Sequence, residues 1–257
     1  MKHPLRTLLL AVCCGLAAAC TQRQERLKLM SYNIRNGIGI DNIQDIGRIA
    51  RVILREAPDL VALQELDSAT LRVDGRYIPG ELGRMTGMHA TFGRAIGFAG
   101  GSYGIGLLSR TEPLAGCSFP LPGREEARVL LMAEFPDYTV CITHLSLTPE
   151  DRLASLPIIR EATDTCRKPV LLAGDFNTGN AAAVLAGLGG GFRILSDTTR
   201  MTFPSDNPAV RIDYILGRGL PTSATVAESA VDHTATASDH CPLWVTLVWK
   251  RGKQPGK

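Results

Sequence analysis

The stretch Pro169-Val-Leu-Leu-Ala-Gly-Asp-Phe-Asn177 joins an apolar run to two polar residues. The apolar run from Val170 to Ala173 predicts a buried strand, and Gly174 ends that run. Side chains two residues apart point to the same side of a strand, so Asp175 and Asn177 leave the strand end together. A carboxylate there can take a proton or hold a metal-bound water, and a carboxamide can donate to an anionic oxygen. The alternative is a strand followed by an ordinary Asp/Asn turn.

Other predicted strands also deliver polar residues at their ends. A strand over Leu27 to Asn33 ends at an asparagine, and a buried strand over Leu60 to Leu63 is followed by Gln64 and Glu65. Glu65 could equally be a surface charge, and a lone histidine such as His144 at a strand end is more often structural. The strand-end groups are Asn33, Glu65, His144, Asp175 with Asn177, and Asp239 with His240.

One predicted strand carries an acidic residue in its middle. Val210 to Leu216 alternates between two faces, which places Asp213 in mid-strand. An unpaired buried carboxylate is costly. We therefore expect Asp213 to have a partner.

The remaining pattern predicts a single α/β domain over residues 27 to 250, followed by a tail over 251–257. Amphipathic periodicity and proline positions predict four helices. The helices are expected at Asp45 to Glu56, Pro79 to Met85, Pro149 to Cys166 and Ala181 to Leu188. Further strands are expected at Met88 to Ile96, Tyr103 to Ser109, Arg128 to Phe135 and Tyr138 to Thr143, with a final strand at Pro242 to Val248.

The first 20 residues predict an export signal. Lys2 and Arg6 precede an apolar run, Leu8 to Ala19, that is too short to span a bilayer comfortably. The run ends in Leu16-Ala-Ala-Ala-Cys20, which resembles a bacterial lipobox with Cys20 as the lipidated residue. Ordinary signal cleavage with Cys20 as a bystander is the alternative. Residues 21–26 would then form a short tether, and we expect an exported, membrane-anchored lipoprotein of the bacterial cell envelope.

Composition limits the classes of function. The net charge of +3 falls to +1 without Lys2 and Arg6, and no Lys/Arg block marks a general nucleic-acid binder. Three of the seven cysteines lie in the first 20 residues, and the others, Cys117, Cys141, Cys166 and Cys241, lack C-x-x-C spacing. A zinc site is therefore not expected, and we expect buried thiols. We also expect the chain to act as a monomer.

Seven short motifs resemble the endonuclease/exonuclease/phosphatase family in order and spacing. They are Ser31-Tyr-Asn33, Gln64-Glu65, Tyr103-Gly-x-Gly106, Thr143-His144, Gly174-Asp-Phe-Asn177, Ile212-Asp213 and Ser238-Asp-His240. The resemblance implies a DNase I-like, four-layer α/β/β/α sandwich of two packed mixed sheets with the site at one edge. Because the donors are oxygens without a cysteine or multi-histidine set, Mg²⁺ (or Mn²⁺ or Ca²⁺) is the expected cofactor.

The resemblance also implies roles for individual residues. Glu65 would be the principal metal ligand, helped by Asn33 and Asp239. Asp175 would orient or deprotonate the attacking water, and Asn177 would steady it or bind phosphate.

On the same resemblance, Asp213 would hold His240 toward the phosphate as a stabiliser or base. His144 would contact the phosphate or assist the leaving oxygen, and Tyr103 would bind a phosphate oxygen. Arg128 is a further candidate for substrate contact, with a surface salt bridge as the alternative.

These expectations lead to a metal-dependent phosphoesterase that acts on a phosphomonoester or phosphodiester by in-line attack of water. Small phosphoesters and lipid head groups are favoured as substrates, because the near-neutral mature chain lacks a basic stripe. An extracellular nuclease is the enzymatic alternative. A surface binding protein on the same scaffold is the non-enzymatic one.

Overall fold

The structure is a computed structural model that describes residues 24–250. The predicted signal, the lipobox Cys20 and the tail lie outside the described residues. None of the described helices is long and apolar enough to cross a membrane.

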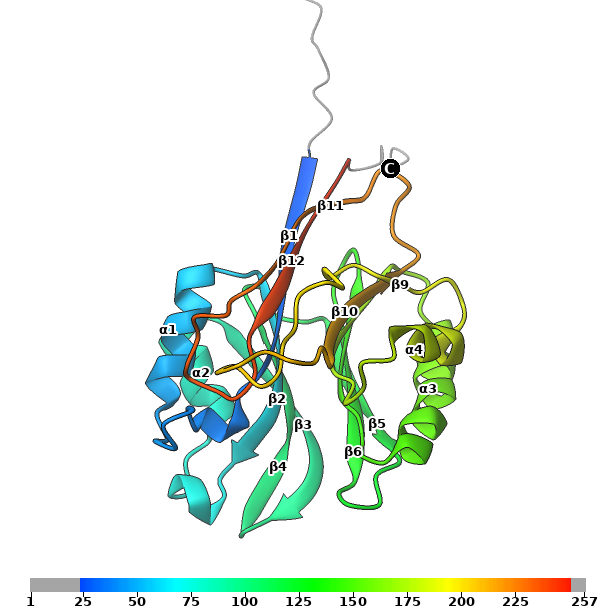
Figure 1. Ribbon diagram of the computed structural model, residues 1–257. Helices are drawn as coiled ribbons and strands as arrows, with labels where there is room; N and C mark the ends of the chain where they lie inside the picture. The colour runs from blue at the N-terminus through cyan, green and yellow to red at the C-terminus, as the bar shows by residue number, and fades with distance from the viewer. Residues whose placement is uncertain (1–23, 251–257) are drawn as a thin grey trace, which may run out of the picture.

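Two six-stranded sheets pack face to face (Figure 1). The first has the strand order β11 (Thr225–Val231), β12 (Leu243–Lys250), β1 (Gln24–Asn33), β2 (Leu60–Ser68), β4 (Gly101–Ser109) and β3 (His89–Phe98). The second has the order β5 (Ala115–Leu121), β6 (Arg128–Glu134), β7 (Thr139–His144), β8 (Val170–Asp175), β10 (Asp213–Arg218) and β9 (Arg193–Ile194). Each sheet combines parallel and antiparallel pairs, so both are mixed.

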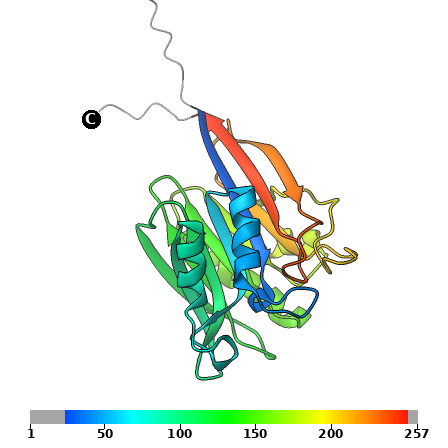
Figure 2. The ribbon, with the colours of Figure 1, turned by 90° about the vertical axis from the view of Figure 1, so that its left-hand side faces the viewer.

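Helices cover the outer face of each sheet, which completes the four-layer sandwich (Figures 1 and 2). The first sheet carries α1 (Ile46–Glu56) and α2 (Ile78–Thr86), and the second carries α3 (Pro149–Asp164) and α4 (Ala181–Leu188). Two short 3₁₀ helices follow β1 and β2, at Arg35–Gly37 and Leu71–Val73. The DNase I-like architecture expected from the sequence is confirmed.

The apolar run before Asp175 is explained by burial on both faces of β8. Leu171 and Ala173 lie in the core between the two sheets, whereas Val170 and Leu172 pack under α3 and α4. A strand covered on both sides reads as a continuous apolar run rather than an alternation. Asp175, the last residue of β8, is where this run reaches the edge of the sandwich.

Several expected elements differ from the structure. β1 begins at Gln24, so Gln24 to Arg26 pair with β12 instead of forming a tether. The short edge strands β5, β9 and β11 were not predicted, because much of β5 and β11 is exposed and carries no regular apolar alternation, and β9 has only two residues. β10 begins at Asp213, so this residue is not in mid-strand as expected. Val210 instead forms an isolated bridge to Phe203.

The cysteine prediction holds only in part. All four described cysteines are free thiols, and Cys141 and Cys241 are buried as expected. Cys117 is exposed and Cys166 is half-buried, since they lie on β5 and just beyond α3 at the surface. The expectation of buried thiols is therefore wrong for Cys117.

Candidate functional site

Strand register places the acidic and histidine side chains of the second sheet next to one another. His144 ends β7 opposite Asp175 in the parallel β7–β8 pair, and Asp213 begins β10 opposite Asp175 in the antiparallel β8–β10 pair. Asn33 ends β1 in the facing sheet, beside Gln64 of β2. The sandwich therefore brings strand ends from both sheets to one edge, away from the ends of β1 and β12 that pair at Gln24 and Lys250.

Asp175 is the centre of this cluster. Its side chain is buried, and Asn33 Nδ2 donates to its Oδ2 at 3.2 Å. The backbone N–H of Asn177 donates to Oδ1 at 2.8 Å. His144 Nε2 and His240 Nε2 lie 3.5 and 3.7 Å from Oδ2. A carboxylate so placed is the natural acceptor for a proton at the centre of the site.

Asp213 and His240 form a buried pair. Asp213 Oδ2 lies 3.0 Å from His240 Nδ1, which leaves Nε2 of the ring directed toward Asp175. The His240 ring also packs against Phe203, with centroids 4.8 Å apart. Two contacts thus fix the ring, and Asp213 has the partner that its burial requires.

Oxygen donors gather around Asn33 on the other side of the site. Asn33 Nδ2 donates to Glu65 Oε1 at 3.0 Å, and Ser238 Oγ links the Asn33 carbonyl to Asp239 Oδ1 at 2.7 and 3.3 Å. Glu65 lies at a β-bulge in β2 and has φ of 57°. A bulge changes the direction in which a side chain leaves its strand. Arg35 Nε lies 3.5 Å from Asp239 Oδ2.

This donor set fits a hard divalent cation. Glu65, Asn33 and Asp239 offer carboxylate and amide oxygens, the ligands that Mg²⁺, Mn²⁺ and Ca²⁺ prefer. A second group, Asp175, Asp213 and His240, has ligand atoms within 4.8 Å of one another. That group includes a histidine nitrogen, whereas the Glu65 side has only oxygen donors, which suit these ions better.

The buried charges shift the pKa values of the site residues apart. Burial, and then the charge of Asp213, raises the pKa of Asp175 above its usual range. Burial and the positive charges of Arg128 and His240 hold the pKa of His144 well below its usual value. Burial also opposes protonation of His240, but the carboxylates of Asp213, Asp175 and Asp239 outweigh it and raise the pKa. At neutral pH His144 is therefore neutral and His240 is charged.

Two further predicted residues lie beside this cluster. Asn177 has φ of 49°, and its Nδ2 donates to the Leu145 carbonyl at 2.8 Å, so the amide binds the segment after His144. Tyr103, on β4, is buried, and its pKa is raised by burial and by the charges of Glu65 and Glu126. Both residues reach the site region, while their roles toward phosphate stay predictions.

Arg128 lies inside the protein beside the site. Its side chain is 6% exposed and pairs with Glu125 and Glu126 at 3.3 and 3.1 Å. The surface salt bridge considered from the sequence is thus a buried one. The charge of Arg128 acts on both His144 and Tyr103.

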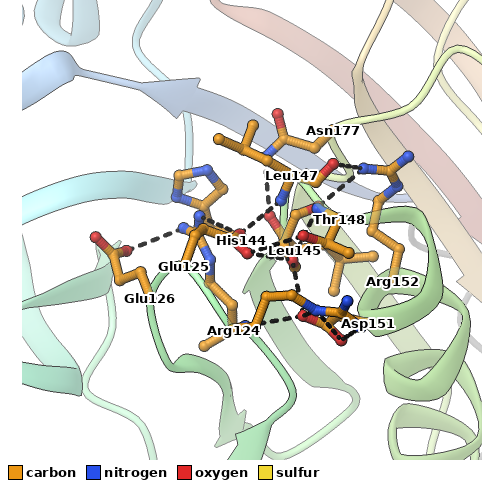
Figure 3. A network of polar contacts seen from close by, with 12 residues as sticks. Arg124, Glu125, Glu126, His144, Leu145, Leu147, Thr148, Asp151, Arg152 and Asn177 are labelled. Atoms are coloured by element: carbon orange, nitrogen blue, oxygen red, sulfur yellow. Dashed lines mark hydrogen bonds and ion pairs between the residues drawn. The ribbon is translucent and has the colours of Figure 1, made fainter.

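Glu125 anchors the segment that follows His144 (Figure 3). Its carboxylate accepts from Ser146 Oγ at 2.8 Å and from the Leu147 backbone N–H at 2.7 Å. Burial opposes the charged form, but these hydrogen bonds, its own backbone N–H and Arg128 outweigh burial and lower the pKa of Glu125 to about 2.

Glu125→Gln is expected to lower the free energy of unfolding by about 1 kcal/mol at pH 7, less than the pKa shift alone would imply, because solvent screens this exposed residue. Because the folded pKa of Glu125 lies below the unfolded one, its stabilising effect is present above about pH 4.5 and is lost as pH falls toward 2. Urea unfolding at pH 7 and pH 3.5 measures this, with the exposed Glu161→Gln on α3 as the control. A difference from wild type that is the same at both pH values contradicts the assignment.

The sequence argument missed several residues that shape the site. Ser238 bridges Asn33 and Asp239 and stood inside a quoted motif, but no role was assigned to it. Glu125 and Phe203 carry no local signal, because their contacts to Leu147 and His240 are distant in sequence.

Comparison with known proteins agrees with the resemblance seen in the sequence. The model of the endonuclease/exonuclease/phosphatase family matches residues 30–240. Among curated proteins, none matches the chain.

Solved structures share the fold. An endonuclease/exonuclease/phosphatase from Beutenbergia cavernae DSM 12333 is 24% identical with a TM-score of 0.70, over 88% of this chain and 72% of that one. The mannosyl-6-phosphatase Bt3783 of Bacteroides thetaiotaomicron VPI-5482 is 19% identical with a TM-score of 0.68, over 86% and 99%. D. rerio TDP2, complexed with a single-strand DNA product, is 22% identical with a TM-score of 0.65, over 86% and 98%.

Proposed function

This chain belongs to the endonuclease/exonuclease/phosphatase family, and we propose that it is an exported, divalent-metal-dependent phosphoesterase for small phosphoesters or lipid head groups. One observation carries the proposal. Asp175 is a buried carboxylate contacted by Asn33, Asn177 and two histidines, one of which is oriented by Asp213. Such a constellation suits proton transfer and charge stabilisation at a phosphorus centre.

Glu65, Asn33 and Asp239 would hold Mg²⁺, or Mn²⁺ or Ca²⁺, beside Asp175. When bound, the ion supplies positive charge for the phosphoryl oxygens and the leaving oxygen. Asn33 donates to both Glu65 and Asp175, so one amide fixes the distance between the metal-binding carboxylate and the candidate base.

The protonation states divide the remaining roles. Asp175, with its raised pKa, takes the proton of the attacking water. Protonated His240 donates from Nε2 to a phosphoryl oxygen, which favours its role as a stabiliser over that of a base. Neutral His144, next to Asp175, contacts the phosphate on the side of the leaving oxygen.

Charge pairing near the site supports a small substrate. Arg35 pairs with Asp239, Arg128 with Glu125 and Glu126, and Arg124 with Asp151. A nucleic-acid track instead relies on cations that are available to successive phosphates. The nuclease alternative is kept for the test below, since TDP2 shares the fold.

We also propose that the chain is exported through its first 20 residues, is lipidated at Cys20 and acts as a monomer at the cell envelope. The short positive region, the apolar run and the lipobox-like ending support this. Metabolic labelling with a radioactive fatty acid, compared between wild type and Cys20→Ser, tests the lipid. Labelling that survives in Cys20→Ser contradicts the assignment.

Product release by the purified mature chain tests the function. The substrates are p-nitrophenyl phosphate, bis-p-nitrophenyl phosphate, plasmid DNA and sphingomyelin, each with Mg²⁺, Mn²⁺, Ca²⁺ or EDTA. EDTA-sensitive hydrolysis of the small esters or the lipid supports the proposal, and cleavage of DNA alone supports a nuclease. Bound metal without turnover of any substrate supports a binding protein.

EDTA is expected to abolish turnover, and added Mn²⁺ or Mg²⁺ to restore it. Glu65→Gln removes one charge from the proposed ligand set and should raise the half-saturating Mn²⁺ concentration by about tenfold or more. Titration calorimetry with Mn²⁺ measures binding apart from activity, with the exposed Glu161→Gln as the control. Equal Mn²⁺ affinity in both variants and in wild type contradicts the ligand role.

A further inference from the structure

A recess of about 210 Å³ opens beside the site, between the first turns of α3 and α4. Most of its walls are apolar side chains, and three polar residues complete them. The polar residues are Arg152, Thr178 and Asn180, and the apolar walls include Leu145, Leu153 and Ala183.

Two lining residues of the recess are sequence neighbours of residues in the catalytic cluster. Leu145 directly follows His144, and its carbonyl accepts from Asn177 Nδ2 at 2.8 Å. Thr178 directly follows Asn177 on the opposite wall. Figure 3 shows Asn177 on one side of the His144–Leu147 segment, with Arg152 reaching the same segment from α3. If Asn177 and His144 hold the phosphate, as proposed above, the recess is the nearest apolar surface beside them that could take the organic group.

Each polar side chain of the recess makes at least one hydrogen bond within the protein. Asn180 Oδ1 accepts from the Ala183 N–H at 3.0 Å, and Thr178 Oγ1 accepts from the Asn180 N–H at 3.1 Å. Arg152 Nη1 donates to the carbonyl oxygens of Ser146 and Leu147, the former at 3.1 Å. These bonds hold the polar side chains against the backbone, and the larger part of the lining is apolar.

We propose that this recess binds an aryl or short alkyl group of the phosphoester, and so selects apolar esters over sugar phosphates. The inference rests on the proposed function for the position of the phosphate. The size fits, because apolar cavities of roughly 150 Å³ take up benzene in other proteins. Leu153, 57% exposed at the rim, supplies further apolar contact.

Filling the recess should remove this preference selectively. Ala183→Phe places a ring in the recess, whereas Ala182→Phe adds the same ring at an exposed position of α4 that does not line it. We expect Ala183→Phe to lower kcat/KM for phenyl phosphate by about tenfold or more and for methyl phosphate by less than about twofold. Comparing each variant with wild type on the same substrate cancels the difference in leaving-group reactivity.

A second variant guards against a folding defect in Ala183→Phe. Leu153→Asn removes an apolar rim contact at an exposed position and should also lower kcat/KM for phenyl phosphate more than for methyl phosphate. Equal loss on both substrates, or no loss in either variant, overturns the inference. Selective loss on mannose 6-phosphate with phenyl phosphate unaffected also overturns it.

A binding measurement separates this inference from the proposed function. Saturation-transfer NMR in EDTA detects phenyl phosphate ring protons in contact with the protein without turnover. Transfer in wild type and Ala182→Phe that disappears in Ala183→Phe supports the recess even if no ester is hydrolysed with any metal, in which case the proposed function alone fails. Absence of transfer in wild type, or its persistence in Ala183→Phe, overturns the recess as the binding place.

Discussion

His240→Gln is expected to lower kcat for phosphoester hydrolysis by about 10²–10³-fold while the fold is retained. The reason is that protonated His240 places a positive charge at a fixed position in the site. His240 is buried, its Nδ1 lies 3.0 Å from Asp213 Oδ2, and the surrounding carboxylates raise its pKa. Glutamine can keep a hydrogen bond to Asp213 but cannot carry the positive charge into the site.

The control is His89→Gln, which changes an exposed histidine at the first residue of β3. His89 pairs with Ser109, at the end of β4 opposite to Tyr103. Circular dichroism and thermal melting of both variants separate folding from chemistry. A His240→Gln enzyme with near-wild-type kcat would falsify the assignment of His240.

Asp213 should act through His240, and this has two measurable consequences. The losses in kcat of Asp213→Asn and His240→Gln should not add in the double variant, because the second change removes what the first one orients. Since Asp213 raises the pKa of His240, Asp213→Asn should also move the alkaline limb of the pH–rate profile to lower pH. Additive losses with an unmoved limb indicate two independent roles.

The fold was predictable where local pattern and burial agree. The apolar run of β8 is covered on both faces, and the helical periodicity of residues 46–56 matches a helix with Asp45 as its N-cap. The meeting of His144, Asp175 and Asp213 follows from strands that end in register at one edge. No single motif indicated that these strands end at the same edge. The order of all seven motifs, which matches the family, did.

What the sequence could not predict depends on contacts between distant segments. The direction of the Glu65 side chain depends on a β-bulge in which Glu65 has φ of 57°. The bulge forms where β2 pairs with β4, and it leaves no local apolar pattern in the sequence. The start of β10 at Asp213 follows from Thr202 Oγ1, which accepts from the Ile212 and Asp213 N–H groups at 3.2 and 3.3 Å. Glu125 lies in the connection between β5 and β6, 21 residues before Ser146 in sequence. It accepts a hydrogen bond from Ser146 in the loop after His144.

Asp175→Asn is expected to cause the larger loss, about 10³–10⁴-fold in kcat, because the amide cannot take the proton of the attacking water. The change keeps the size of the side chain and an oxygen for the Asn177 N–H, now 2.8 Å from Oδ1. Turnover is measured at saturating Mn²⁺, where a loss of metal affinity would not reduce the rate. A variant with more than a tenth of the wild-type kcat contradicts a role for Asp175 as the base.

The stability of the same variant should depend on pH differently from that of the wild type. Burial and the charge of Asp213 raise the folded pKa of Asp175 from 3.8 to about 7, so between these values the folded state binds more protons than the unfolded state. Wild-type stability therefore falls as pH rises through this window, and the asparagine variant lacks that loss. In EDTA, the Tm of Asp175→Asn relative to wild type should rise from pH 4.5 to pH 7.5. If the difference in Tm is constant or shrinks, Asp175 is charged in the folded protein throughout, and its place in the site serves metal binding rather than proton transfer.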